Sequence, residues 1–432
     1  MTGLAKNFKK LGMSASPRVL GMAAVLALTA CAGGNHPPPT GKTVAAEPPA
    51  AQAPLKAPAP VQGTVKVGLL LPLSGPGANV GSEMLNAAQI ALFDLGEERF
   101  TLLPRDTKGS PAEAAEAARK LIADGAKLIL GPLFATEVDA AAPVAHASGV
   151  NLLAFSNDWQ RAGNGTYILG FVPADQVARI VGYAHLRGLS RIAVLAPRNP
   201  YGDAVIAALH DSAQRQGVTV VREERYTADN ADLAAAVARL GGGAKPAPAP
   251  AAAAPAAPAS PPAPAATPAG GAFDALLIAD GGERLKAIAP LLATNHIDPA
   301  RVRLLGTGLW DDPGVARLPG IAGAWFAAPA PQARADFEGR FEGLYHHRPA
   351  RLATLAYDAT ALAAVLARLP AATSFDAISL TNPSGFAGVD GIFRLRGDGL
   401  VERGLAVIEI SPQGPRVIDQ APASFEAVSA IR

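Results

Sequence analysis

Cys31 is the residue whose type and position most directly predict a chemical modification. It ends the tetrad Leu28-Thr29-Ala30-Cys31, which follows a basic start and an apolar run. A Leu-small-small-Cys tetrad in that context is typical of a bacterial lipoprotein signal peptide, whose cleavage frees the cysteine for acylation. The apolar run, residues 19–28, has about ten residues and is too short to span a bilayer. We expect residues 1–30 to be removed and Cys31 to carry lipid; the alternative is an ordinary secretory signal followed by an unrelated cysteine.

The charge balance of the chain changes when the predicted signal is removed. Residues 1–30 contain four basic residues and no acidic ones, so 38 basic and 36 acidic residues become 34 and 36, a net charge of −2. A near-neutral chain without a basic stripe argues against nucleic acid as a partner. Because Cys31 is the single cysteine, an internal disulfide cannot form.

Motifs for catalysis and for metal or phosphate binding are missing or broken in this sequence. It has no G-x-S-x-G and no H-E-x-x-H, and its seven histidines are scattered apart from His346-His347, which successive helix positions would direct apart. Gly41-Lys42-Thr43 lacks the earlier glycine of a phosphate-binding loop. The glycines of residues 75–81 are spaced G-x-G-x-x-x-G, one residue too long for a dinucleotide-binding loop. We therefore predict no enzymatic activity, no cofactor and no metal.

The elements that would position binding residues alternate between short apolar runs and longer amphipathic segments. This alternation predicts parallel sheets with helical crossovers. The predicted strands are 65–71, 101–104, 128–130, 151–154, 192–195, 218–221, 275–279 and 303–305. The predicted helices are 81–95, 111–123, 174–187, 201–216, 233–240 and 283–294. Doubly wound sheets bind ligands beyond the carboxyl ends of their strands, so we expect binding residues in the loops that follow the strands.

Two segments are too rich in Ala, Pro and Gly to build a hydrophobic core. Residues 31–63 are predicted to be an extended tether behind the lipidated cysteine. Residues 241–271 interrupt the folded region and are predicted to be a disordered surface insertion. The remaining ~340 residues exceed what one hydrophobic core usually serves, so we expect two lobes.

Four loop motifs follow one another along the chain, and their order is informative. They are Leu71–Ala78, Gly131–Leu133, Pro173–Gln176 and Pro200–Gly202. Together they resemble the type I periplasmic solute-binding fold of the leucine/isoleucine/valine-binding proteins, from about residue 65 to residue 410. The resemblance implies an α/β protein with two doubly wound lobes joined by three crossovers. The expected division is 64–171 plus 329–373 for lobe one, 172–328 plus 374–410 for lobe two, and 411–432 as a C-terminal tail.

Three further motifs are Ala154–Asp158, Gly323–Pro329 and Leu355–Ala359. They resemble the penicillin-binding protein activator lipoproteins, a family whose members stand in the outer membrane and stimulate peptidoglycan synthases. The resemblance implies that this chain regulates peptidoglycan synthesis and that its partner is such a synthase. Ala32, which follows the cysteine, implies sorting to the outer membrane by likeness to other bacterial lipoproteins.

The resemblance also implies a set of ligand-binding residues. In amino-acid-binding relatives, hydroxyls and backbone amides after the lobe-one strands hold the ligand's carboxylate and ammonium, and an acid or a tyrosine from lobe two closes over it. Each charge of a zwitterion must be replaced in kind when water is excluded. The matching positions are Ser74, Val80, Ala135, Thr136, Phe155, Ser156 and Asn157 in lobe one, and Tyr201 and Asp280 in lobe two.

Structural interpretations of the same residues stay open. Thr136 could be the N-cap of a helix. Residues 156–158 could form a turn that satisfies its own backbone, and residues 280–282 could form another. Tyr201 could simply pack at the start of a helix.

We expect a non-enzymatic, lipid-anchored protein of the periplasm, held at the outer membrane, that regulates a penicillin-binding protein. The alternative is the solute-binding receptor of an ABC importer for branched-chain or related amino acids. Its partner would be an ABC permease, and its two lobes would close on a small amino-acid-like ligand.

Overall fold

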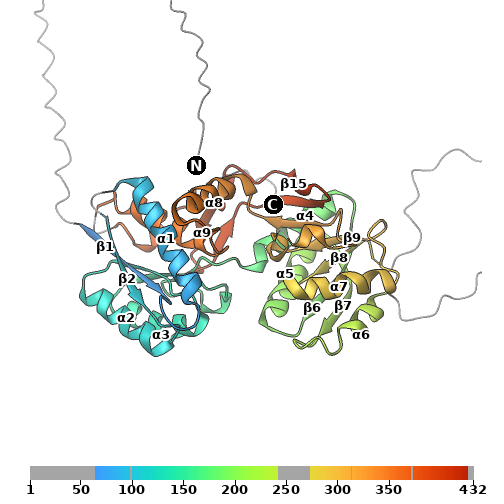
Figure 1. Cartoon of the computed structure of the whole chain (residues 1–432), viewed down its shortest axis with the longest axis horizontal. Coiled ribbons are helices and arrows are strands. Elements are labelled where there is room, and N and C mark those ends of the chain that lie inside the picture. Colours follow the sequence, from blue (N-terminus) through green and yellow to red (C-terminus); the bar gives the residue numbers. More distant parts are fainter. Residues whose placement is uncertain (1–63, 98–99, 242–272, 313, 371–372, 427–432) are drawn as a thin grey trace, which may run out of the picture. The chain divides into compact units, whose positions relative to one another are not determined.

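A computed structural model describes residues 64–97, 100–241, 273–312, 314–370 and 373–426 of the 432-residue chain (Figure 1). The predicted signal peptide, Cys31, the tether up to residue 63 and the Ala/Pro insertion beyond Gly241 lie outside these residues. Among the described helices, none is both long and apolar enough to cross a membrane.

The first five strands form a parallel sheet in the order β2-β1-β3-β4-β5. The strands are β1 (Val65–Leu71), β2 (Phe100–Asp106), β3 (Leu128–Leu130), β4 (Asn151–Ala154) and β5 (Thr166–Ile168). The connecting segments are the helices α1 (Ala78–Leu95), α2 (Pro111–Ala123) and α3 (Ala135–Ala147) and the 3-10 turn η1 (Trp159–Arg161). Parallel neighbours need long connections, which is why an amphipathic helix follows each of the first three strands.

A second sheet has seven strands in the order β15-β14-β10-β9-β8-β6-β7. The strands are β6 (Arg191–Pro197), β7 (Thr219–Tyr226), β8 (Ala275–Ile278), β9 (Arg303–Gly306), β10 (Trp325–Ala328), β14 (Ala406–Ser411) and β15 (Gly414–Asp419). The helical segments among them are α4 (Pro173–Leu186), α5 (Pro200–Gln216), α6 (Leu233–Leu240), α7 (Gly282–Thr294), η2 (Gly308–Trp310) and η3 (Val315–Arg317). Strands β6 to β10 pair in parallel, whereas β14 and β15 are antiparallel to their neighbours.

After β10 the chain returns to the five-stranded sheet. Helix α8 (Pro331–Tyr345) is followed by α9 (Ala353–Leu366), which packs against α1 (Figure 1). Next come α10 (Ala377–Leu380) and a small antiparallel sheet of β11 (Phe386–Gly388), β12 (Gly391–Leu395) and β13 (Val401–Arg403).

The structure moves two of the boundaries that the sequence suggested. Residues 374–410 were expected with the second lobe, but Phe375, Leu380 and Phe393 are buried in the same cluster as the five-stranded sheet. The Ile168 N–H also donates a hydrogen bond to the Gly399 carbonyl (2.8 Å) at the edge of that sheet. The chain joins the seven-stranded sheet only at β14. Residues 411–432 are not simply a tail either, because β15 pairs along β14.

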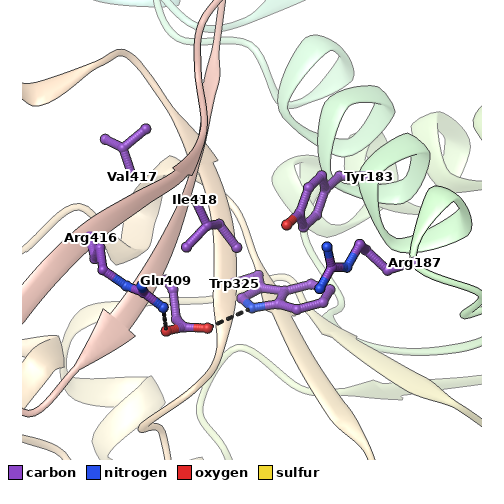
Figure 2. A pocket seen from close by; sticks show the side chains of 7 residues that line it. All are labelled: Tyr183, Arg187, Trp325, Glu409, Arg416, Val417 and Ile418. Carbon is purple, nitrogen blue, oxygen red and sulfur yellow. Dashed lines mark hydrogen bonds and ion pairs between the residues drawn. The ribbon is translucent and has the colours of Figure 1, made fainter.

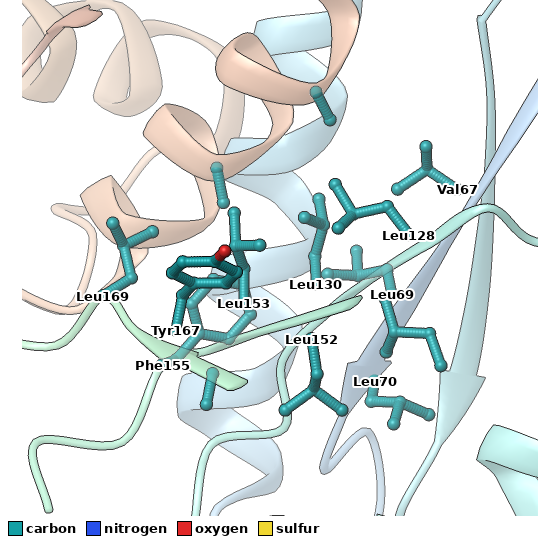
Figure 3. Packing of buried hydrophobic residues seen from close by; sticks show 14 of the residues in the cluster. Val67, Leu69, Leu70, Leu128, Leu130, Leu152, Leu153, Phe155, Tyr167 and Leu169 are labelled. Carbon is teal, nitrogen blue, oxygen red and sulfur yellow. The ribbon is translucent and has the colours of Figure 1, made fainter. Parts of the chain in front are cut away.

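The core of the five-stranded sheet is a row of side chains across four strands (Figure 3). Leu69, Leu130, Leu153 and Tyr167 are directly opposite one another on β1, β3, β4 and β5, and the three leucines are fully buried. Leu70, one residue after Leu69, and Leu152, one residue before Leu153, are fully buried as well. A parallel sheet covered on both faces needs such continuous apolar strands, and burying each leucine contributes roughly 1.5–3 kcal/mol.

Glycine lets two helices start close to the strand before them. A Cβ atom on Gly81, in the first turn of α1, would overlap the carbonyl oxygen of Pro72 beyond β1. A Cβ atom on Gly202, in the first turn of α5, would overlap the carbonyl oxygen of Pro197 at the end of β6. In each sheet, the first helix can therefore start this close to its strand only because the residue in its first turn is glycine.

We predict that Gly81→Ala and Gly202→Ala each lower the free energy of unfolding by about 1–3 kcal/mol, because the helix must move away from the strand. Gly339→Ala is the matched control: its position in α8 has open space around it, so alanine should raise stability by about 0.5–1 kcal/mol. Urea denaturation of the purified variants measures all three. Equal effects at the three positions would contradict the role assigned to Gly81 and Gly202.

Candidate functional site

The predicted lobe-one residues lie together at the carboxyl edge of the five-stranded sheet. They follow β1, β3 and β4, which are adjacent strands, and parallel strands end at the same edge. These residues are Ser74, Ala135, Thr136, Phe155, Ser156 and Asn157. Val80 lies in the first turn of α1 and packs against the core of the sheet.

Asp106, the last residue of β2, fixes the loop that carries Ser74. Its Oδ1 accepts hydrogen bonds from the backbone N–H groups of Leu73 and Lys108 (both 2.8 Å), and its Oδ2 accepts one from the Ser74 hydroxyl (2.6 Å). Partial burial opposes ionisation, but these hydrogen bonds outweigh it and hold the pKa of Asp106 below its usual value. The hydroxyl proton of Ser74 is thereby committed, so Ser74 offers a ligand only its lone pairs.

Glu137 fixes the loop after β3 through hydrogen bonds. Its side chain is fully buried, and its two oxygens accept hydrogen bonds from the Thr107 hydroxyl (2.6 Å) and the Phe134 N–H (3.1 Å). Burial raises the pKa of Glu137 in spite of these hydrogen bonds. Helix α3 begins at Ala135 with Phe134 as its N-cap residue, so Thr136 is not the N-cap.

The first turn of α3 has hydrogen-bond donors without an acceptor among the described residues. The N–H groups of Ala135 and Thr136 have no acceptor within the helix, because the first residues of a helix lack the preceding turn. The Thr136 side chain is exposed, and its hydroxyl has no partner within the described part of the chain. These donors and the positive end of the helix dipole suit a ligand's oxyanion.

The loop after β4 contributes one free amide. Phe155 is 2% exposed and belongs to the core. Ser156 is also buried, and its Oγ accepts a hydrogen bond from the Asp158 N–H (3.1 Å), which is the contact of the turn interpretation. The exposed Asn157 side chain has no hydrogen bond to any described residue. Asn157 is therefore the residue of this loop best able to contact a ligand.

Tyr201 and Asp280 follow β6 and β8, which are neighbours in the seven-stranded sheet. The Tyr201 hydroxyl is 2.7 Å from the hydroxyl of Thr307, which follows the next strand, β9, and is fully buried. Burial raises the pKa of Tyr201, so this phenol stays protonated at physiological pH. Tyr201 does more than pack, because it links two strand ends of this sheet.

The Asp280 carboxylate is engaged inside its own lobe. Its oxygens accept hydrogen bonds from the Tyr226 hydroxyl and the Gly281 N–H (2.8 Å), and the Arg284 guanidinium lies 3.4 Å away. The Asp280 carbonyl accepts the indole N–H of Trp310 (2.8 Å). With 7% of its surface exposed, Asp280 has little capacity left for a ligand's ammonium.

This arrangement can hold an anion more readily than a cation. Asp106, Glu137 and Asp280 each accept internal hydrogen bonds, whereas Thr136 and Asn157 keep free donors. The described residues contain no group of His, Cys, Asp or Glu that could hold a metal ion. The chemistry on offer is reversible binding through N–H and O–H donors.

Sequence reasoning missed several residues that shape this site. Asp106, Thr107 and Thr307 stand at or directly after strand ends, and Glu137 stands one residue beyond Thr136. A polar residue directly after a predicted apolar strand was the available signal.

A charged cluster surrounds the segments that pass between the two sheets. Phe171, in the first passage, lies between the guanidinium groups of Arg351 (4.4 Å from the ring centroid) and Arg403 (5.0 Å). Arg351 donates a hydrogen bond to Asp390 (2.8 Å). Burial, and then the nearby Asp390, raise the pKa of Asp358, which is 1% exposed. Burial acts on Asp390 in the same sense, but the two arginines outweigh it and lower the pKa of Asp390.

Comparison with known proteins identifies the fold. A profile of the periplasmic binding protein family matches residues 64–415. An ABC transporter substrate-binding protein from Sphaerobacter thermophilus superposes with a TM-score of 0.63 at 16% identity, covering 83% of this chain and 98% of that one. These findings confirm the predicted type I periplasmic binding protein fold.

Curated relatives match over shorter stretches. The Leu/Ile/Val-binding protein BraC3 of Rhizobium johnstonii is 25% identical over 187 residues, which are 41% of this chain and 51% of that protein. The penicillin-binding protein activator LpoA of Pectobacterium parmentieri is 33% identical over 116 residues, 26% of this chain and 17% of that protein. The chain thus spans about half the length of the Leu/Ile/Val-binding relative it matches, and far less of the activator.

We predict that Asp358→Asn makes stability less dependent on pH. The folded-state pKa of Asp358 is raised from 3.8 to about 7, so its stabilising effect is complete below pH 3.8 and is lost as the pH rises through 7. In that window the wild type should lose of the order of 1 kcal/mol per pH unit relative to the variant.

Urea denaturation between about pH 5 and pH 8 measures this difference. Asp211→Asn, at an exposed aspartate paired with Arg215, is the matched control and should follow the wild type. Parallel curves for the wild type and Asp358→Asn would contradict the prediction.

Proposed function

The chain belongs to the periplasmic binding protein family, and we propose that it is a receptor for a small carboxylate-bearing solute that it delivers to an ABC permease. The observation that supports this proposal best is the first turn of α3, where two N–H groups and the Thr136 hydroxyl stand unused at the carboxyl edge of the sheet. Asn157, from the adjacent loop, adds a further free donor.

The proposed solute is defined by its carboxylate rather than by an ammonium. A buried ammonium needs an acceptor of opposite charge. Asp280, the acid suggested by likeness to amino-acid receptors, already contacts Arg284, Tyr226 and Gly281. An organic acid, or an amino acid whose ammonium stays in contact with water, therefore fits better than a fully enclosed zwitterion.

Binding in this proposal uses both sheets. The carboxylate occupies the first turn of α3, and Tyr201 approaches from the seven-stranded sheet, with the two lobes closing about the passages between them. The two lobes are the two sheets with their helices, and residues 374–403 belong to the first lobe. A ligand would favour the closed state through its additional contacts there.

A second candidate function is regulation of a peptidoglycan synthase. It is favoured by the 33% identity to the activator LpoA over 116 residues. The importer-type relatives support the receptor proposal more broadly, because BraC3 matches 187 residues and the S. thermophilus structure covers 83% of the chain. We therefore favour the receptor function over the regulatory one.

A periplasmic location with a lipid anchor on Cys31 belongs to this proposal, whereas sorting to the outer membrane belongs to the regulatory candidate. Cys31→Ser removes both the acylated thiol and the last residue of the cleavage tetrad, so the variant should carry no lipid, whereas the wild type should begin at a lipidated Cys31. Mass spectrometry of the N-terminus of each protein measures this. A wild-type N-terminus without lipid would contradict the anchor.

We predict that a thermal-shift screen of the purified protein against amino acids and small organic acids finds a solute that raises Tm, because a ligand selective for the folded state stabilises it by mass action. Thr136→Ala should weaken binding of that solute by about tenfold, the worth of one hydrogen bond to a charged group. Calorimetric titration of the wild type and the variant measures the ratio.

Thr219→Ala is the matched control, because Thr219 is an exposed threonine at the amino end of β7. Its affinity for the solute should equal that of the wild type. Absence of a shift with every solute, together with co-purification of a peptidoglycan synthase, would replace the receptor proposal by the regulatory one.

A further inference from the structure

A surface pocket of about 340 Å³ opens on the seven-stranded sheet, away from the site described above. Figure 2 shows Trp325 at its centre, with Tyr183 and Arg187 on one side and Glu409 and Arg416 on the other. These residues come from α4 and the turn after it, from β10, and from β14 and β15. Its volume is within the range of small-molecule sites.

The pocket lies at the opposite edge of the sheet from the proposed solute site. Trp325 and Arg303 are the first residues of β10 and β9, whereas Thr307 and Asp280 follow the carboxyl ends of β9 and β8. A ligand here would therefore not contact Tyr201 or Thr307. Any function of this pocket is additional to the proposed receptor function.

The hydrogen-bond acceptors of the pocket are engaged by a row of side chains that runs across three strands. Trp325, Glu409 and Arg416 are directly opposite one another on β10, β14 and β15. One oxygen of Glu409 accepts the Trp325 indole N–H (3.2 Å) and the other accepts Arg416 (2.8 Å). The Arg303 guanidinium covers the indole, 4.4 Å from the ring centroid. Both oxygens of Glu409, the pocket's only carboxylate among the described lining residues, are thus engaged.

Donors remain unused on the α4 side. The Tyr183 ring is packed edge-on against Trp325 (5.1 Å between centroids), and its hydroxyl has no hydrogen bond to a described residue. The Arg187 guanidinium lies 5.8 Å from the Tyr183 ring centroid and has no carboxylate partner in the described part of the chain. The Arg416 side chain is 66% exposed, which leaves guanidinium N–H groups beyond its bond to Glu409 open to a ligand.

The charge of the pocket agrees with this excess of donors. Arg187, Arg303 and Arg416 carry three positive charges against the single negative charge of Glu409. Two further charges on α4 and β15, Arg179 and Asp419, pair with each other (2.8 Å) and cancel. A ligand that brings only acceptors and a negative charge satisfies both conditions.

We infer that this pocket binds a small molecule through a carboxylate or phosphate group, which Arg187, Arg416 and the Tyr183 hydroxyl hold while its apolar part rests on Ile418. Arginine binds such oxyanions through paired N–H groups. The site acts as an accessory anion site of the receptor.

The chain contains three tryptophans, which give built-in reporters for the test. Trp325 lies in the pocket, Trp310 lies beside Asp280 in the solute site, and Trp159 lies in η1. The purified protein is labelled with 15N-tryptophan and titrated with inorganic phosphate, acetate and benzoate, with chloride at equal ionic strength as reference. Trp325→Phe identifies the pocket signal.

The inference predicts a saturable shift of the Trp325 indole signal, with Trp310 unmoved. Arg187→Gln and Tyr183→Phe should each weaken the effect by about tenfold or more. Arg119→Gln, at an exposed arginine of α2, is the matched control and should leave it unchanged. Phosphate alone causing the shift would identify a phosphate-bearing ligand, whereas benzoate exceeding acetate would identify an organic acid.

Three outcomes would overturn the inference: no shift of Trp325 at millimolar concentrations of any probe, an equal shift with chloride, or full binding by Arg187→Gln. A shift of Trp310 alone would report binding at the carboxyl edge, which concerns the receptor proposal and not this pocket. The two proposals therefore fail separately.

Discussion

Arg403 is a buried cation at the point where the chain passes for the last time between its two sheets. A guanidinium stays protonated at any physiological pH, so a buried one needs acceptors and carboxylates around it. Its Nη2 donates to the Leu169 carbonyl (2.7 Å), and its backbone N–H donates to Asp175 (3.0 Å), both at the first passage. Asp390, whose pKa the nearby arginines lower, supplies negative charge from the segment that follows the second passage. The first and the last passage thus meet at one cation.

The alternation of apolar and amphipathic segments was enough to predict β1 to β4 and β6 to β9, which form most of the parallel parts of both sheets. Strands such as β1 and β6 are buried on both faces, so apart from Lys66 and Arg191 their sequences are apolar and easy to recognise. Strands β5 and β10, of three and four residues, escaped prediction although they are parallel to their neighbours. So did β11 to β15, which form antiparallel pairs with exposed positions in β11 and β15. Their positions depend on contacts with distant segments, which local periodicity does not encode.

The site was predictable in its place but not in its chemistry. The rule that ligands bind beyond the carboxyl ends of parallel strands pointed to the loops. The resemblance to amino-acid-binding proteins then implied Ser74, Thr136 and Asn157, which lie at adjacent strand ends. Whether a polar side chain is free or already engaged depends on partners from other strands. Asp280 illustrates this, because its partner Tyr226 is 54 positions away. Only the three-dimensional structure separates the free donors of Thr136 from the committed hydroxyl of Ser74.

The place of β14 in the seven-stranded sheet has a consequence for how the protein is made. Strand β10 has β9 on one side and β14 on the other, and β14 begins at residue 406 of 432. Until β14 has left the ribosome or the export channel, β10 presents an unpaired edge open to strands of other molecules. Completion of this sheet therefore waits for β14. A product truncated before β14 would expose the unpaired edge of β10 and aggregate through it. A chaperone that shields nascent chains would bind at this edge.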